Sequence, residues 1–210
     1  MPDYSRIWVR VRDITREGLV PVYDQVKKMA GGAAIMANVD HNVSLISGIH
    51  DLLPNRTGGE AMQKNLENLG DIIYTQEEID FAIQMQKENG KPIIGIDGKI
   101  RPLRETLESP GGGSTDVGDV SYNVPVVSLA ATTAPKGVPW HSWSVVASSG
   151  MSIGHKGMLH ATKALGMTMI DIFKDKKLRE EIKKEFDERM GNYKYDPFLN
   201  PGPPPIDYVD

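Results

Sequence analysis

The sequence predicts an α/β fold, and three observations lead to that prediction. Residues 6–12 alternate apolar and polar side chains, which is typical of a strand with one buried face. Residues 124–130 form a continuous apolar run rich in β-branched side chains, which indicates a buried strand. Apolar positions recur at helical spacing in residues 19–29, and residues 157–173 favour an apolar helix.

The opening segment is expected to form a strand, a helix and a second strand. Thr15 or Asp13 can cap the helix, and Gly31-Gly32 is expected to end or interrupt it. A second alternating stretch follows at residues 39–45. Because two strands and one helix cannot close a core, we interpret this segment as part of a layer whose other strands lie elsewhere.

The rest of the chain is expected to contain helices joined by loops. Thr75-Gln76-Glu77-Glu78 is typical of a capping box, so one helix should begin at Thr75. Residues 89–110 are expected to be mostly loop, and the proline-rich tail 196–210 is expected to be extended. The helices predicted after the first span residues 60–69, 75–88, 157–173 and, as a charged continuation, 174–190.

Composition excludes several functional classes. The 210-residue chain has 40% hydrophobic residues, enough for a sizeable core, and a formal net charge of −4, which argues against nucleic-acid binding. It has no cysteine, so disulfides, thiolate metal sites and cysteine nucleophiles are excluded. No apolar run reaches the roughly 20 residues that span a bilayer, and the first residues lack a signal-peptide pattern. We therefore expect a soluble, cytoplasmic protein with no membrane or nucleic-acid partner.

Two of the five histidines are candidates for a functional site. His141 follows the apolar run 124–130, where α/β sheets place ligands, and could be a zinc ligand or a loop anchor packed between two tryptophans. His155 stands near a helix amino terminus, which suits an anionic substrate group, although a solvated cap is the alternative. We interpret His41 and His160 as structural, and His50 stays ambiguous.

A glycine-rich turn forms the second candidate region. The glycine run that includes Gly112 and Gly113 precedes Ser114-Thr115-Asp116 and lets the backbone approach a ligand closely, and its N–H groups could cradle a carboxylate. Ser114 does not lie in a Gly-x-Ser-x-Gly elbow, so a serine hydrolase is not expected. The sequence has no His-Glu-x-x-His motif either.

Several of these motifs together resemble one family. They are Gly111–Ser121, Pro139–Trp143, Ile46–Asn55 and Ser152–Met158, and they resemble the end of the co-catalytic zinc peptidases and amidohydrolases. This family is number twenty of the metallopeptidases and includes the aminoacylases and carboxypeptidase G. The resemblance implies an α/β catalytic domain interrupted by a lid domain of the βαββαβ (ferredoxin-like) type, which usually mediates dimerisation.

The resemblance also implies a domain division and site residues. Residues 1–48 would be the second half of the lid or dimerisation domain, and residues 49–210 the carboxy-terminal part of the catalytic domain. His141 takes the place of the last metal ligand, and Asp116 that of an aspartate in a turn that lines the active site. His155 has a counterpart only within a subgroup. The other metal ligands and the general base of the family precede the lid, so no residue here is predicted to be catalytic.

The implied function is that of a carboxy-terminal portion of a metal-dependent amidohydrolase. The complete enzyme would hydrolyse N-acyl amino acids such as p-aminobenzoyl-glutamate, or small peptides, with zinc or manganese. This chain would be inactive alone, would hold little metal, and would form a homo-oligomer or associate with a chain that supplies the amino-terminal half. The alternatives are a non-catalytic assembly or binding module, and one chain of a split two-chain hydrolase.

Overall fold

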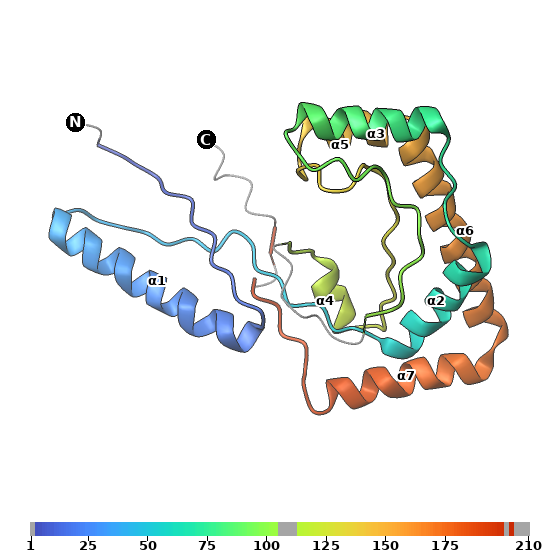
Figure 1. Cartoon of the computed structure of the whole chain (residues 1–210). Coiled ribbons are helices and arrows are strands. Elements are labelled where there is room, and N and C mark those ends of the chain that lie inside the picture. The colour runs from blue at the N-terminus through green and yellow to red at the C-terminus, as the bar shows by residue number, and fades with distance from the viewer. Residues whose placement is uncertain (1–2, 105–112, 200–201, 204–210) are drawn as a thin grey trace. The chain divides into compact units, whose positions relative to one another are not determined.

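A computed structural model describes residues 3–104, 113–199 and 202–203 of the chain. The described residues form helices and connecting segments (Figure 1). The helices are α1 (Arg16–Ala37), α2 (Arg56–Leu69), α3 (Gln76–Glu88), α4 (Val117–Ser121), α5 (Trp143–Ser149), α6 (Ser152–Lys174) and α7 (Lys176–Met190). None of these helices is long and apolar enough to cross a membrane.

The chain divides into two compact units. The first comprises Met1–Leu53, Leu107–Val124 and Asn192–Asp210, and the second comprises Pro54–Thr106 and Pro125–Gly191. Helices α1 and α4 belong to the first unit, and α2, α3, α5, α6 and α7 to the second. Residues 49–53 therefore group with the opening segment, whereas the sequence predicts a boundary after residue 48. That predicted boundary concerns the domains of the family and stays a prediction.

Helix α1 is longer than the sequence predicts. Its amino end is capped by Thr15, whose Oγ1 accepts a hydrogen bond from the Gly18 N–H at 3.2 Å, as expected. The predicted end or interruption at Gly31-Gly32 is wrong, because the helix continues to Ala37. Glycine costs about 1 kcal/mol relative to alanine in a helix but does not break it. The helix ends instead at Asn38, which adopts the left-handed conformation with φ 53° and ψ 52°.

The predicted strands have no ladder partners among the described residues. Residues 6–12, 39–45 and 124–130 all lie outside the helices, and none of them pairs in a β-ladder in the part of the chain that the structure describes. The run 124–130 is partly exposed rather than buried, with Val124 half exposed. A strand needs a neighbour in a sheet, and the described residues supply none, so the α/β class stays a prediction.

The core of the second unit is helical. Helix α2 packs against α6 and α7, and α6 also contacts α5 and α7 (Figure 1). Met62 of α2, Ala164 of α6 and Ile182 of α7 are all buried in this unit. The buried Asn65 side chain donates to Thr168 Oγ1 at 3.0 Å and so joins α2 to α6 by a polar contact.

The α6–α7 junction differs from the predicted continuous helix. Asp175 interrupts it, because its N–H closes α6 on the Asp171 carbonyl while its side chain accepts from the Leu178 N–H of α7 at 3.1 Å. The break lets α7 turn across the start of α2. There Glu185 accepts from the N–H groups of Arg56 and Thr57 at 2.8 and 2.7 Å. These N–H groups have no partner within their own helix.

Helix α3 confirms the predicted capping box. Thr75 Oγ1 accepts from the Glu78 N–H, and Glu78 Oε2 accepts from the Thr75 N–H at 2.7 Å. Near the other end of α3, the fully buried Gln86 bonds to the backbone of Gly95 and Lys136, so one side chain fixes two loops. The described part of 89–110 is loop, as predicted.

Candidate functional site

The predicted glycine-rich turn leads directly into the short helix α4. Gly112 lies outside the described residues, while Gly113, Ser114, Thr115 and Asp116 are all exposed. Asp116 is the residue before α4, and its side chain makes no capping bond, so its carboxylate is free of any local backbone role. Ser114 Oγ accepts a hydrogen bond from Arg12 at 3.4 Å. The side chains of residues 114–116 (the turn segment) are exposed, and the Thr115 hydroxyl bonds to Asp116 and to the Val117 N–H.

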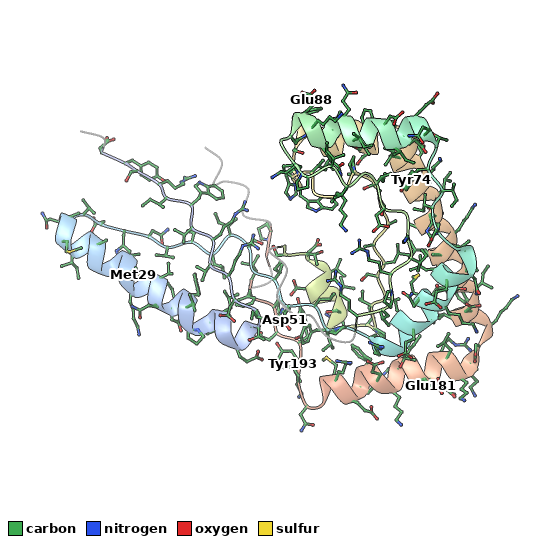
Figure 2. All side chains as sticks on the ribbon, viewed as in Figure 1. Met29, Asp51, Tyr74, Glu88, Glu181 and Tyr193 are labelled. Carbon is green, nitrogen blue, oxygen red and sulfur yellow. The ribbon has the colours of Figure 1, made fainter. Side chains whose placement is uncertain are left out.

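His50, which the sequence left ambiguous, lies at the centre of a polar cluster in the first unit. It is 3% exposed, and its Nδ1 lies 2.7 Å from Asp119 Oδ1. Its Nε2 lies 2.6 Å from Arg16 NH1 and 2.9 Å from the hydroxyl of Tyr193. The Tyr195 hydroxyl donates to the same Asp119 oxygen at 3.1 Å. Figure 2 labels Tyr193 among the side chains of this unit. The cluster therefore joins four segments that are distant in sequence.

The partners of His50 fix its tautomer. Arginine carries only donors, so the Arg16 guanidinium can bond to Nε2 only if that nitrogen is an acceptor. The proton of the neutral ring must then be on Nδ1, where it is donated to Asp119. The ring thus presents a donor edge to α4 and an acceptor edge to the start of α1.

Aromatic and charged side chains surround this cluster. The Tyr122 hydroxyl donates to Asp51 Oδ2 at 3.1 Å, and the Tyr122 ring lies 5.0 Å from His50. Burial, reinforced by the Asp51 carboxylate, raises the pKa of Tyr122 to about 12. Phe198, from the first part of the predicted extended tail, lies beneath the Arg16 guanidinium at 4.2 Å. The described beginning of the tail thus packs against α1 through the contact between Phe198 and Arg16.

His141, the predicted metal ligand, has an unusual backbone. Its φ is 59°, in the left-handed region that non-glycine residues seldom adopt. Its side chain is exposed, and its neighbours Trp140 and Trp143 are 74% and 58% exposed, so it is not packed between two buried tryptophans. The ligand role and the loop-anchor role of His141 both stay predictions.

The described residues do not complete a metal site around His141. No group of three or more histidine, aspartate or glutamate side chains in those residues is arranged to hold an ion. The co-catalytic metal pair implied by the family resemblance requires several ligands, and His141 offers one. The described residues by themselves therefore do not fit that group, and we derive no reaction step through a metal.

His155 lies in the first turn of α6 and is exposed, as the sequence predicts for a residue near a helix amino terminus. The neighbouring positions already hold a carboxylate. Glu78 Oε2 accepts from Lys156 Nζ at 2.6 Å, and the Glu78 carboxylate also bonds to the Ser152 side chain. Burial alone would raise the pKa of Glu78, but the bonds from Lys156, Ser152 and the Thr75 N–H outweigh it and hold the pKa at about 2.

The predicted site residues are divided between the two units. Ser114, Thr115 and Asp116 form one stretch in the first unit, whereas His141 and His155 belong to the second unit, before α5 and at the start of α6. Sequence reasoning did not find the His50 cluster. Asp119 lies 69 residues from His50 and Tyr193 lies 143 residues away, so no local spacing could indicate them.

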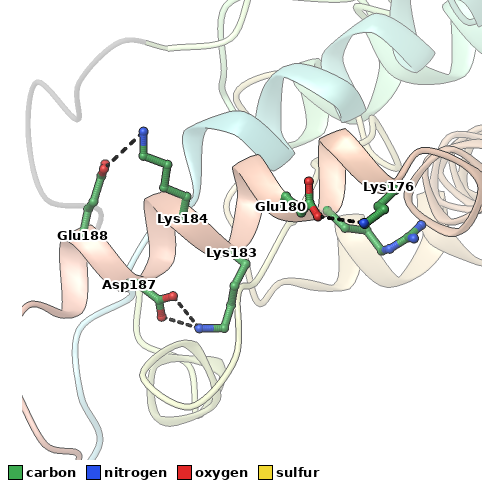
Figure 3. Close-up of a pocket in the computed structure, with 7 residues that line it drawn as sticks. Lys176, Glu180, Lys183, Lys184, Asp187 and Glu188 are labelled. Atoms are coloured by element: carbon green, nitrogen blue, oxygen red, sulfur yellow. Dashed lines mark hydrogen bonds and ion pairs between the residues drawn. The ribbon is translucent and has the colours of Figure 1, made fainter.

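A shallow surface hollow runs along α7 (Figure 3). Each of its lysines is paired with an acid one turn later: Lys176 with Glu180, Lys183 with Asp187, and Lys184 with Glu188. Paired, exposed charges at this spacing are typical of a solvated helix face. The hollow carries no candidate site.

Comparison with known proteins adds one finding. No family model and no solved structure matches the chain. Among curated proteins, the B subunit of p-aminobenzoyl-glutamate hydrolase from Escherichia coli (strain K12) is 34% identical to it over 188 residues. The chain is a relative of this hydrolase. The match covers 78% of the chain and 39% of the Escherichia coli protein, so the chain spans about two fifths of the length of the curated relative it matches.

The likeness to this relative supports the coarser part of the sequence-based resemblance. A related amidohydrolase or peptidase is the expected class, and the relative's name gives a hydrolase of p-aminobenzoyl-glutamate. The metal, the zinc-peptidase family and the roles of His141, His155 and the turn segment stay predictions.

Proposed function

We propose that this chain forms part of a hydrolase that cleaves the amide bond of p-aminobenzoyl-glutamate or a similar N-acyl amino acid. The observation that carries the proposal is the 34% identity to the Escherichia coli p-aminobenzoyl-glutamate hydrolase over most of the chain. Because only 39% of that relative is matched, the proposal includes further residues, in the same or another polypeptide, that complete the active site.

In the proposed enzyme, the turn segment contributes to the substrate pocket. The N–H groups of this exposed segment and the Ser114 hydroxyl can bond to a carboxylate, a group that every acyl-glutamate carries. The Asp116 carboxylate can accept a hydrogen bond from an N–H of the substrate. Both contacts orient the amide without taking part in its cleavage.

His141 is the proposed metal-binding residue. In the complete enzyme it would be one of several ligands of a zinc or manganese ion, the others coming from residues outside this chain. The imidazole of His141 is exposed and could donate a nitrogen lone pair to such an ion. His155, also exposed, is the proposed contact for an anionic group of the substrate.

The test is hydrolysis by the enzyme expressed with its complete coding region. The release of p-aminobenzoate from p-aminobenzoyl-glutamate is measured for the wild type and for His141→Ala, with His41→Ala as the matched control. His41 is exposed in the first unit and has no proposed role. We expect His141→Ala to abolish hydrolysis and His41→Ala to retain it.

Two results would contradict the proposal in different ways. Full activity in His141→Ala would refute the ligand assignment while leaving the substrate class intact. A well-folded wild-type enzyme that releases no p-aminobenzoate, and hydrolyses no other acyl-glutamate, would refute the substrate class itself.

Association with another chain is also part of the proposal. Helix α6 exposes Met158, Leu159, Met169, Ile170 and Phe173, each more than half exposed. Large exposed apolar side chains on one helix favour a protein partner, either a second copy or a chain that supplies the rest of the enzyme. The molar mass of the native protein in solution tests this, since a lone, folded and stable monomer would count against association. Such an assembly role without catalysis is the second candidate function.

A further inference from the structure

Helix α4 is too short to be stable by itself. It spans five residues, whereas isolated helices shorter than about 12–15 residues are marginal in water. Its position therefore depends on contacts with other segments. Four of these contacts are made to the same stretch of chain, residues 50–53.

The four contacts involve residues along the whole of α4. Gly118 lies so close to the His50 carbonyl that a Cβ atom there would be 2.1 Å from its oxygen. Asp119 accepts from His50 Nδ1, and Ser121 Oγ accepts from the Leu53 N–H at 2.9 Å. At the carboxyl end of the helix, Tyr122 donates to Asp51.

Of the hydrogen bonds among these contacts, the one between His50 and Asp119 is the shortest, at 2.7 Å. It joins a buried ring to a carboxylate, and hydrogen bonds to charged groups contribute more than neutral ones. His50 is itself held from the other side by Arg16 and Tyr193. The ring is therefore held at both of its edges.

Helix α4 is in turn joined directly to the turn segment. The Gly118 N–H donates to the Thr115 carbonyl at 3.2 Å, and the Asp119 N–H donates to the Asp116 carbonyl at 3.1 Å. A displacement of Asp119 would thus move the backbone of residues 115 and 116.

We propose that His50 is a positioning residue that holds the turn segment in place through the Nδ1–H···Asp119 bond and α4. The proposal rests on the proposed function, in which the turn segment contacts substrate. His50 itself is buried and does not touch substrate.

A pair of substitutions separates the two edges of the ring. In His50→Asn, the side-chain amide N–H lies where Nδ1 lies, so the donor to Asp119 is kept and the Nε2 contacts are lost. In His50→Gln, the amide reaches the place of Nε2, so contact with Arg16 is kept and the donor to Asp119 is lost. Tyr193→Phe is the control, because it removes one contact of the Nε2 edge alone.

The readout is amide hydrogen exchange of the full chain, followed in the peptide that covers residues 113–124. Loss of a charged, buried hydrogen bond should raise local exchange by about tenfold or more in His50→Gln. We expect exchange within about threefold of wild type in His50→Asn and Tyr193→Phe, and unchanged exchange in α1 in all three variants.

Two results would overturn the proposal. Equal exchange at residues 113–124 in His50→Gln and wild type would show that α4 does not need the bond. Faster exchange in α1 as well would show that His50 merely stabilises the whole unit. If His50→Gln does not fold, Asp119→Ala removes the same bond from the partly exposed side. Tyr195→Phe is then the control, because Asp119→Ala also removes the bond from the Tyr195 hydroxyl.

Activity of the complete enzyme separates this inference from the proposed function. We expect His50→Gln to raise KM for p-aminobenzoyl-glutamate by about tenfold with a smaller change in kcat, and His50→Asn to restore most of the loss. Faster exchange at residues 113–124 with an unchanged KM would refute the substrate role of the turn segment and leave the positioning intact. Unchanged exchange would refute the positioning at any level of activity.

Discussion

Helix α6 contains two glycines for which the same substitution should have opposite effects. A Cβ atom at Gly157 would lie 2.2 Å from the Thr132 carbonyl oxygen and 2.9 Å from Thr133 Cγ2. At Gly166, nine residues later, no atom lies within 4 Å of the Cβ position. Alanine is favoured over glycine in a helix by about 1 kcal/mol at either site. Only an alanine at position 157 would also have to displace a neighbouring backbone, that of Thr132.

The expected change in the free energy of unfolding is the sum of the gain in helix propensity and the cost of steric overlap. Gly166→Ala should stabilise the second unit by about 1 kcal/mol, because the gain in helix propensity is not opposed. At Gly157 the clash is with a carbonyl group that cannot rotate away, so the cost should lie near the upper end of the 1–3 kcal/mol seen for overpacking, that is about 3 kcal/mol. Gly157→Ala should therefore destabilise the unit by about 2 kcal/mol.

Guanidinium unfolding measures both effects. Tryptophan fluorescence in a Trp8→Phe background reports the second unit alone, because Trp140 and Trp143 both belong to it. The free energy of unfolding is compared for Gly157→Ala, Gly166→Ala and the background. If Gly157→Ala stabilises the protein as much as Gly166→Ala does, the backbone at Thr132 does not pack against α6 and the reasoning fails.

Three further predictions concern titratable groups. The Glu185 pKa is held at about 2, because the N–H groups of Thr57 and Arg56 outweigh a burial effect that would raise it. The Glu185 carboxylate should therefore stabilise the fold above pH ~4.5, and this stabilisation should be lost as the pH falls towards 2. In thermal unfolding at pH 7, Glu185→Ala should lower the free energy of unfolding by about 1–3 kcal/mol, and the loss of stability between pH ~4.5 and 2 should become smaller. Lys156→Met should raise the pKa of the Glu78 carboxyl from about 2, which NMR titration detects, and an unchanged value would contradict the ion pair. Tyr122, with a pKa raised to about 12, should ionise after the exposed tyrosines in an absorbance titration. Its contribution to the free energy of unfolding should be lost between pH ~10 and 12. If Tyr122→Phe removes no late step from the titration, Tyr122 is not buried beside Asp51.

The local helix features could be predicted from the sequence. The capping box at Thr75 and the end of α3 at Glu88 lie where the pattern places them, because both depend on residues within one turn. Thr15 and Asp13 were the two candidate caps for α1, and Thr15 is the one whose side chain accepts a hydrogen bond from the Gly18 N–H of the first turn. The start of α6 at Ser152 was missed, since the residue before it, Met151, has no capping side chain.

Features held by distant contacts could not be predicted in this way. Helix α4 has no periodic pattern of its own, and its position depends on residues 50–53. The role of His50 could not be predicted from the sequence, because its partners Asp119 and Tyr193 are distant along the chain and meet it only in the fold. The predicted turn segment was found from its glycines, but nothing in its sequence indicates what holds it.

The single residue between α6 and α7 has a consequence for how this chain can vary in length. Asp175 closes one helix and opens the next, and Arg179 donates to the Ile172 and Phe173 carbonyls across the joint. One inserted residue would rotate α7 by about 100° about its axis, since a helix has 3.6 residues per turn. Ile182 would then leave the core, and Glu185 would no longer reach the N–H groups at the start of α2. Insertions should therefore be excluded at this joint in homologous sequences.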